Sequence, residues 1–186
     1  MQPELAQQLL NRLYTDERYL AEFLADRQLF YSKHQFTPET IAFLDALSSK
    51  QLSFYAHSLK AKRYQLVKQQ IPAVCRIMKA ALDEHWRSYV GTYVPQGIHK
   101  HHDDALHFLA FIEQQHLTDF LLSLIKFERL LIGHFIESTK IQLSFHAYDF
   151  TAEYQQILKK ENYIIPQKKW TCILWRSGRI GMKISI

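Results

Sequence analysis

Histidine and aspartate are the residue types in this chain whose spacing could support metal chemistry. They cluster in the segment HKHHDDALH, residues 99–107. Asp103 and His107 are four residues apart and would share one face of a helix. The spacing matches no known zinc pattern, and no cysteine joins the cluster. We therefore predict no metal site, with His101, His102 and His107 as weak candidates and a metalloenzyme built on them as an open alternative.

Motifs that carry catalysis by themselves do not occur in the sequence. It contains no nucleophile elbow, no HExxH, no phosphate-binding loop and no dinucleotide-binding glycine motif. Each of those motifs places a reactive group or a phosphate cradle at a fixed point of a fold. We therefore expect that the chain by itself is not an enzyme and that it holds no cofactor.

Glu128 is the carboxylate that most needs a partner. It lies within a strongly apolar helical pattern, one turn from Leu124 and from Leu131. Burying a carboxylate without a partner is costly. Arg63 interrupts the apolar stripe of another long helix, so we predict a structural ion pair between Arg63 and Glu128. The alternative is that Arg63 extends its charged end to solvent from the edge of the core.

The C-terminal segment changes from helical to strand-like patterning. Residues 170–186, WTCILWRSGRIGMKISI, predict two strands joined at Ser177 and Gly178, because glycine supplies the positive φ of tight hairpin turns. Residues 140–148 alternate apolar and polar side chains, which is typical of a half-buried strand. A helical pattern over residues 149–161 separates this strand from the hairpin.

Positive charge is concentrated in the same segment. Residues 159–186 hold seven lysines and arginines and one glutamate, a net charge of +6 within a total of +5. A local basic surface favours an anionic partner, either an acidic peptide or a nucleic acid.

Three roles are open for the exposed edge of the predicted sheet and the positive charge around it. An extended peptide can add to a free strand edge through main-chain hydrogen bonds. Alternatively, basic residues with Trp170 and Trp175 could bind single-stranded nucleic acid by charge and stacking, or the charges could only protect the edge from aggregation. For the peptide alternative, the predicted contact residues are Ile141, Leu143, Phe145, Arg176, Arg179 and Lys183.

The rest of the chain reads as helix. Start signals include Thr37 before Pro38, and Ser48 three residues before Gln51. A single helix is predicted from Pro72 to about Gly91. The fold class is α+β and mainly α: a helical domain over residues 1–138, then a small unit over residues 139–186 with a three-stranded antiparallel sheet and one helix.

Cysteine use and the N-terminal sequence bear on localisation. The two cysteines, Cys75 and Cys172, are far apart and fit no metal spacing, so free thiols are expected. No basic stretch followed by an apolar run opens the chain, and charged residues interrupt its longest apolar stretch. We therefore expect a cytoplasmic protein without a membrane partner.

Four stretches together resemble a known family. They are LYTDERYLAEFLAD at 13–26, LSFYAHSLKAKR at 52–63, HHDDALHFLAFI at 101–112 and WTCILWRSGRI at 170–180. The resemblance is to MbnC-like proteins, the helical partner subunits of multinuclear non-heme iron oxidative enzymes in methanobactin biosynthesis. It covers most of the chain and rests on packing motifs without catalytic residues.

The resemblance implies a role in a complex. MbnC-like proteins form a heterodimer with an MbnB-like iron enzyme and help to bind the leader of a ribosomally made precursor peptide. Their small sheet is similar to a peptide-recognition element, on which the leader adds as a strand. The enzyme converts a precursor cysteine to an oxazolone with a neighbouring thioamide. Iron belongs to that enzyme, so the resemblance implies no metal ligand in this chain.

Overall fold

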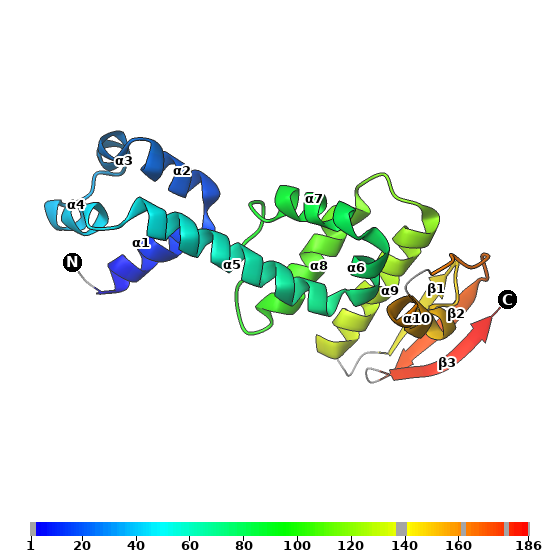
Figure 1. Cartoon of the computed structure of the whole chain (residues 1–186). Helices are drawn as coiled ribbons and strands as arrows, with labels where there is room; N and C mark the ends of the chain where they lie inside the picture. Colours follow the sequence, from blue (N-terminus) through cyan, green and yellow to red (C-terminus); the bar gives the residue numbers. More distant parts are fainter. Residues whose placement is uncertain (1–2, 137–140, 161–162, 177–178, 186) are drawn as a thin grey trace. The chain divides into compact units, whose positions relative to one another are not determined.

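Helices make up most of the chain and strands its C-terminal part, as Figure 1 shows. The structure is a computed structural model that describes residues 3–136, 141–160, 163–176 and 179–185. The predicted fold class, mainly helical α+β with a small three-stranded antiparallel sheet, is confirmed. Within the described ranges, no helix is both long and apolar enough to cross a membrane.

The chain divides into two compact units, residues 1–64 and 65–186. The boundary predicted between residues 138 and 139 falls in a stretch outside the described residues. The C-terminal strands share their unit with the helices that follow residue 65.

Four helices and the start of a fifth make up the first unit. Asp16, Asp26 and Thr37 each accept a hydrogen bond from a backbone N–H of the helix that follows. Pro38 occupies the first turn of the helix that Thr37 caps. Ser48 accepts from the backbone N–H of Gln51, so both predicted start signals are confirmed. The helices are α1 (Pro3–Thr15), α2 (Glu17–Ala25), α3 (Arg27–His34), α4 (Pro38–Asp45) and α5 (Ser49–Gln70).

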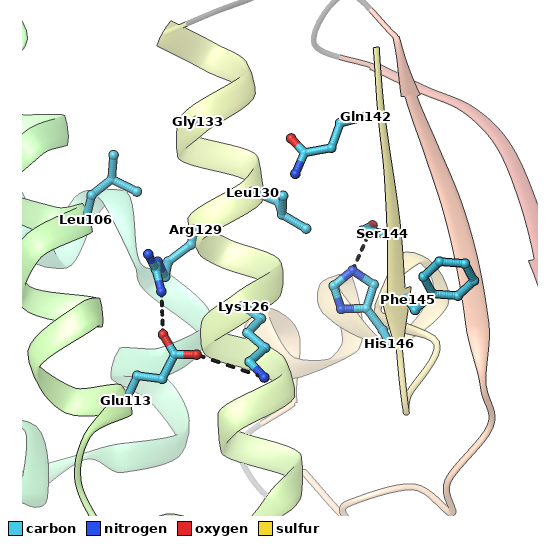
Figure 2. Close-up of a pocket in the computed structure, with 10 residues that line it drawn as sticks. All are labelled: Leu106, Glu113, Lys126, Arg129, Leu130, Gly133, Gln142, Ser144, Phe145 and His146. Carbon is cyan, nitrogen blue, oxygen red and sulfur yellow. Dashed lines mark hydrogen bonds and ion pairs between the residues drawn. The ribbon is translucent and has the colours of Figure 1, made fainter. Parts of the chain in front are cut away.

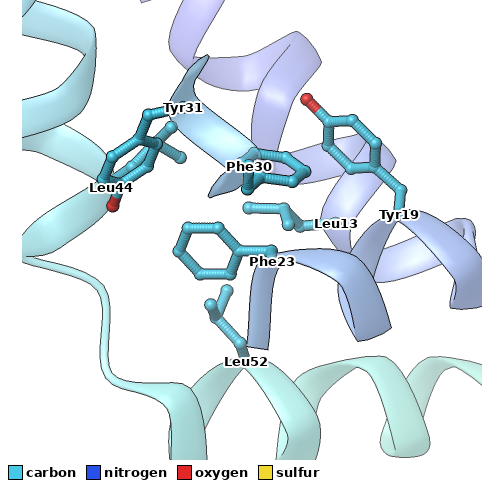
Figure 3. Packing of buried hydrophobic residues seen from close by; sticks show 7 residues of the cluster. All are labelled: Leu13, Tyr19, Phe23, Phe30, Tyr31, Leu44 and Leu52. Atoms are coloured by element: carbon cyan, nitrogen blue, oxygen red, sulfur yellow. The ribbon is translucent and has the colours of Figure 1, made fainter. Parts of the chain in front are cut away.

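The core of the first unit is largely aromatic. Phe23 is fully buried, and its ring lies 5.3 Å from that of Phe30 in an edge-to-face arrangement. Aromatic pairs of this geometry add to the stabilisation from buried area. Figure 3 shows the cluster, which comprises Leu13, Tyr19, Phe23, Phe30, Tyr31, Leu44 and Leu52.

The second unit combines helices with the sheet. Its elements after α5 are α6 (Pro72–Met78), α7 (Ala80–Tyr89), α8 (Lys100–Glu113), α9 (Asp119–Ile136), β1 (Ile141–His146), α10 (Phe150–Lys159), β2 (Thr171–Arg176) and β3 (Arg179–Ser185). The strand order is β1-β2-β3 and both pairs are antiparallel. The predicted turn at Ser177 and Gly178 lies outside the described residues.

The single helix predicted from Pro72 to about Gly91 is wrong. Lys79 separates α6 from α7, with φ 50° and ψ −124°. No glycine or proline marks this break in the sequence, so periodicity alone could not reveal it.

The strand β1 exposes its apolar side. Ile141, Leu143 and Phe145 are 69%, 54% and 69% exposed, whereas Ser144 and His146 are buried. The buried side of the sheet packs on α9, where the Trp175 ring lies 5.7 Å from that of Phe127 and 5.0 Å from that of His134. The sheet therefore presents an apolar surface away from the helices.

Candidate functional site

The candidate site is a pocket of about 460 Å³ between α9 and β1. Figure 2 shows the side chains of Gln142 and His146 on the side of β1 that faces α9, and that of Phe145 on the other side. Because β1 is an edge strand of the sheet, one row of its backbone N–H and C=O groups points away from β2. The lining residues are Leu106 and Glu113 of α8, Lys126, Arg129, Leu130 and Gly133 of α9, and Gln142, Ser144, Phe145 and His146 of β1.

Charged groups at the helical wall of the pocket form a small network. The Glu113 carboxylate accepts a hydrogen bond from Arg129 and lies 4.0 Å from the Lys126 ammonium. Two cations share one carboxylate, so this wall has an excess of positive charge. An anionic side chain of a ligand would be attracted to it.

The β1 wall is polar and neutral. Ser144 Oγ accepts a hydrogen bond of 2.7 Å from Trp175 Nε1 and lies 3.0 Å from His146 Nε2. Burial, together with the positive charge of Lys126, lowers the pKa of His146 to about 4. The imidazole is therefore neutral at pH 7, and Ser144 and His146 add no charge to this wall.

Gly133 leaves open space in the helical wall. A β-carbon added there would meet nothing within 4 Å. Glycine inside a helix costs about 1 kcal/mol relative to alanine. The missing side chain keeps the pocket open beside the free edge of β1.

Four of the six predicted peptide contacts share one face of the sheet. Ile141 is directly opposite Arg176, and Leu143 is opposite Leu174, so these side chains lie on the same exposed face as Phe145. Ile184 of β3 extends this face and is 49% exposed, although the sequence pattern did not single it out.

The other two predicted contacts are not part of this group. Lys183 is opposite the buried Ile173, on the face toward the helices, and its ammonium lies 2.6 Å from an Asp149 carboxylate oxygen. Arg179 is opposite Arg176 in the register, and its side chain lies outside the described part of the chain.

The sequence pattern did not identify the α9 side of the pocket. Lys126 and Arg129 were among the charged residues that interrupt the longest apolar stretch, which was predicted to be a core helix, and Gly133 was not singled out. A possible signal was present, since Gly133 interrupts an otherwise apolar helix at a position where alanine would be more stable.

Glu128 lies on another side of α9 and is fully buried, as predicted. Its carboxylate accepts hydrogen bonds from the backbone N–H groups of Ala73 (2.8 Å) and Val74 (3.2 Å), and from the Tyr154 hydroxyl (2.8 Å). The carboxylate therefore connects α9 to α6 and α10. Arg63 belongs to the first unit, so the ion pair between Arg63 and Glu128 stays a prediction.

Burial and hydrogen bonding act in opposite directions on Glu128. Burial raises the pKa of Glu128 to about 7, although the three hydrogen bonds favour the ionised form. The carboxylate also helps to raise the pKa of Tyr154 above its usual value, after burial itself. Glu128 is thus a structural group that titrates near neutral pH.

The histidine cluster lies along α8. The His107 ring stacks on Tyr93 with centroids 3.9 Å apart, and the His99 and His102 rings are 6.2 Å apart. Among the described residues, no group of three or more histidines, cysteines, aspartates or glutamates is arranged to hold a metal ion.

The two tryptophans proposed for base stacking have different surroundings. Trp175 is 1% exposed and packs on α9, so it cannot stack on a nucleic-acid base. Trp170 is 59% exposed. Of the two rings predicted to stack on bases, only Trp170 is therefore exposed.

No protein-family model matches this chain, and no curated protein matches it either.

Proposed function

We propose that the chain is a non-catalytic partner subunit that binds an extended peptide along the free edge of β1. The observation that carries this proposal is the edge of β1 that pairs with no other strand of the described residues and lies beside a pocket of about 460 Å³. Main-chain hydrogen bonds from β1 would supply affinity. The peptide's side chains would point alternately to the two faces of the sheet, and their contacts there would supply specificity.

The two sides of such a peptide would meet different surroundings. Side chains pointing toward α9 would enter the pocket, where Lys126 and Arg129 favour an acidic residue. Side chains pointing away would lie beside Leu143 and Phe145, which favour apolar residues. The occupant we propose therefore alternates polar or acidic residues with apolar ones.

The resemblance to MbnC-like proteins supplies the biological setting of the proposal. In that setting the peptide is the leader of a methanobactin-type precursor, and the chain forms a heterodimer with an MbnB-like iron enzyme. The peptide-recognition-element-like role of the sheet, the cytoplasmic location and the absence of a cofactor in this chain belong to the same proposal.

Filling the space at Gly133 tests the peptide site. A Gly133→Leu variant should fold, because its β-carbon meets nothing within 4 Å and Gly133 lines a pocket with room for the rest of the side chain. It should weaken binding of a labelled methanobactin-type leader peptide about tenfold or more, since the new side chain occupies the pocket. Fluorescence anisotropy measures the affinity, and Gly133→Ala is the matched control that adds only one methyl group.

Two results would contradict the proposal. One is unchanged leader affinity in a folded Gly133→Leu protein. The other is displacement of the leader by a non-specific single-stranded oligonucleotide, which would favour the nucleic-acid alternative. Co-expression with the iron enzyme followed by a pull-down tests the partner. A chain that purifies as a stable monomer, without the co-expressed enzyme, would contradict the heterodimer.

A further inference from the structure

A second pocket, of about 340 Å³, lies where α6 meets α7 and where the chain leaves α10. It is separate from the pocket beside β1 and shares no lining residue with it. Arg76, Lys79 and Lys160 contribute its cations, and Ile77, Tyr163, Ile164 and Ile165 complete the lining.

The three cations come from two parts of the chain that are far apart in sequence, and all of them line one cavity. Arg76 belongs to α6, Lys79 lies between α6 and α7, and Lys160 follows α10. Arg76 Nε donates a hydrogen bond of 3.2 Å to the Lys160 carbonyl oxygen, which holds these two segments together. The described lining residues include no carboxylate. Like charges gathered in one pocket repel one another, and a bound anion would relieve that repulsion.

Lys79 occupies a backbone conformation that suits glycine. Its φ of 50° with ψ of −124° lies outside the regions that residues with a β-carbon normally adopt. Unfavourable backbone conformations persist only where the surrounding structure enforces them, and they cluster at functional sites. Glycine would adopt this conformation more readily than lysine. What lysine provides at this position and glycine does not is a long cationic side chain that lines the pocket.

Apolar side chains at the pocket narrow the class of ligand. Ile164 is 86% exposed and Ile165 is 50% exposed. A phosphate group or a nucleic-acid backbone would use the cations and leave both isoleucines in water. A polypeptide with carboxylates beside large apolar side chains would cover both kinds of surface.

We propose that this pocket binds an acidic, amphipathic segment of a partner polypeptide, with its carboxylates on Arg76, Lys79 and Lys160 and its apolar side chains on Ile164 and Ile165. The inference goes beyond the peptide site at β1 and does not depend on it.

The substitution Lys79→Gly separates binding from folding. It removes one cation and relieves the backbone, so the variant should unfold at a higher temperature than the natural chain. Its affinity for a short labelled peptide of glutamate and leucine should nevertheless fall about tenfold, the effect of losing one charge-assisted contact. Fluorescence anisotropy on the full chain measures the affinity, and circular dichroism follows unfolding.

Matched controls assign the effect to this pocket. Lys100→Glu makes a charge change at an exposed position at the start of α8, and Gly133→Leu alters the other pocket. Measurements in the Gly133→Leu background exclude binding of the glutamate–leucine peptide at the pocket beside β1. In that background Lys100→Glu should bind the peptide as the parent protein does, whereas Lys160→Glu should not. A peptide with lysine in place of glutamate should not bind.

Three outcomes would overturn the inference. The first is that the natural chain fails to bind the glutamate–leucine peptide. The second is a stabilised Lys79→Gly protein with unchanged affinity. The third is tighter binding of a single-stranded oligonucleotide that is lost in Lys79→Gly, which would assign the pocket to phosphate groups instead.

Discussion

Two buried residues of the second unit, Glu128 and His146, have pKa values shifted from their ordinary values in opposite directions. The surroundings of each residue explain its shift. Glu128 is fully buried among three hydrogen-bond donors, and burial raises its pKa to about 7. His146 lies in the wall of the β1 pocket, and burial with the nearby Lys126 lowers its pKa to about 4. Their effects on stability therefore oppose one another between pH 4.5 and pH 6.5.

The stability of the chain should carry a contribution from Glu128 that decreases as pH rises. The pKa of Glu128 is higher in the folded state than in the unfolded state, so the folded state binds more protons between about pH 4.5 and pH 7. The contribution is fully present below pH 4.5 and is lost as pH rises through 7. It amounts to about 3–4 kcal/mol at most, from roughly 1.4 kcal/mol per pKa unit.

Comparing the natural chain with Glu128→Gln isolates this contribution, because His146 is unchanged in both. Urea unfolding at several pH values should give a difference in unfolding free energy between the two proteins that changes across pH 4.5 to 8. A difference that does not vary with pH would show that Glu128 does not titrate in this range. Glu128→Ala, which leaves the Ala73 and Val74 N–H groups without their acceptor, should be destabilised at every pH.

At the scale of the element, β1 reverses the usual relation between side-chain type and burial. Its polar residues face α9, where Ser144 Oγ accepts a hydrogen bond from Trp175 and forms another with His146. Its apolar residues face away, together with Arg176 and Ile184. Contiguous apolar surface of this kind marks interaction sites in natural proteins.

Substitutions on the two faces of the sheet should therefore differ in cost. Leu143→Thr and Phe145→Thr should change the free energy of unfolding by no more than about 0.5 kcal/mol, because both side chains are exposed. Ile173→Ala, on the buried face of β2, should cost about 2–5 kcal/mol. Equal costs in urea unfolding would mean that the apolar face of β1 is covered in the folded chain.

At the scale of the whole molecule, the chain consists of two compact units. Both candidate pockets lie in the second unit, residues 65–186. The core around Phe23 belongs to the first unit. Binding at either pocket should therefore tolerate damage to the first core.

Phe23→Ala tests this division. It should destabilise the first unit by about 3–5 kcal/mol, because Phe23 is fully buried. Hydrogen exchange should accelerate in α1–α4 and stay unchanged in α9 and β2, and the affinity for the leader peptide should not change. Faster exchange throughout both units would show that the chain unfolds as a single cooperative body.

Local signals in the sequence determined much of the fold. Thr37 with Pro38 and the serine at position 48 define helix starts through hydrogen bonds within a few residues, and both are present in the structure. Alternating side chains predicted β1, two strand-like runs around a glycine predicted β2 and β3, and the helical spacing around Glu128 predicted its burial. These features depend on neighbours along the chain, so the sequence alone could reveal them.

Tertiary packing decided the features that define the candidate sites. Alternation gives β1 two faces but does not say which face is buried. The polar face is buried because Ser144 hydrogen-bonds with Trp175 and His146. Glu128 was expected to need a partner, but its bonds to α6 and α10 depend on how three helices meet. Lys79 breaks a helix in a conformation that its residue type disfavours, and Gly133 opens a pocket only because β1 lies opposite. Each depends on contacts between segments far apart in sequence, which no local pattern encodes.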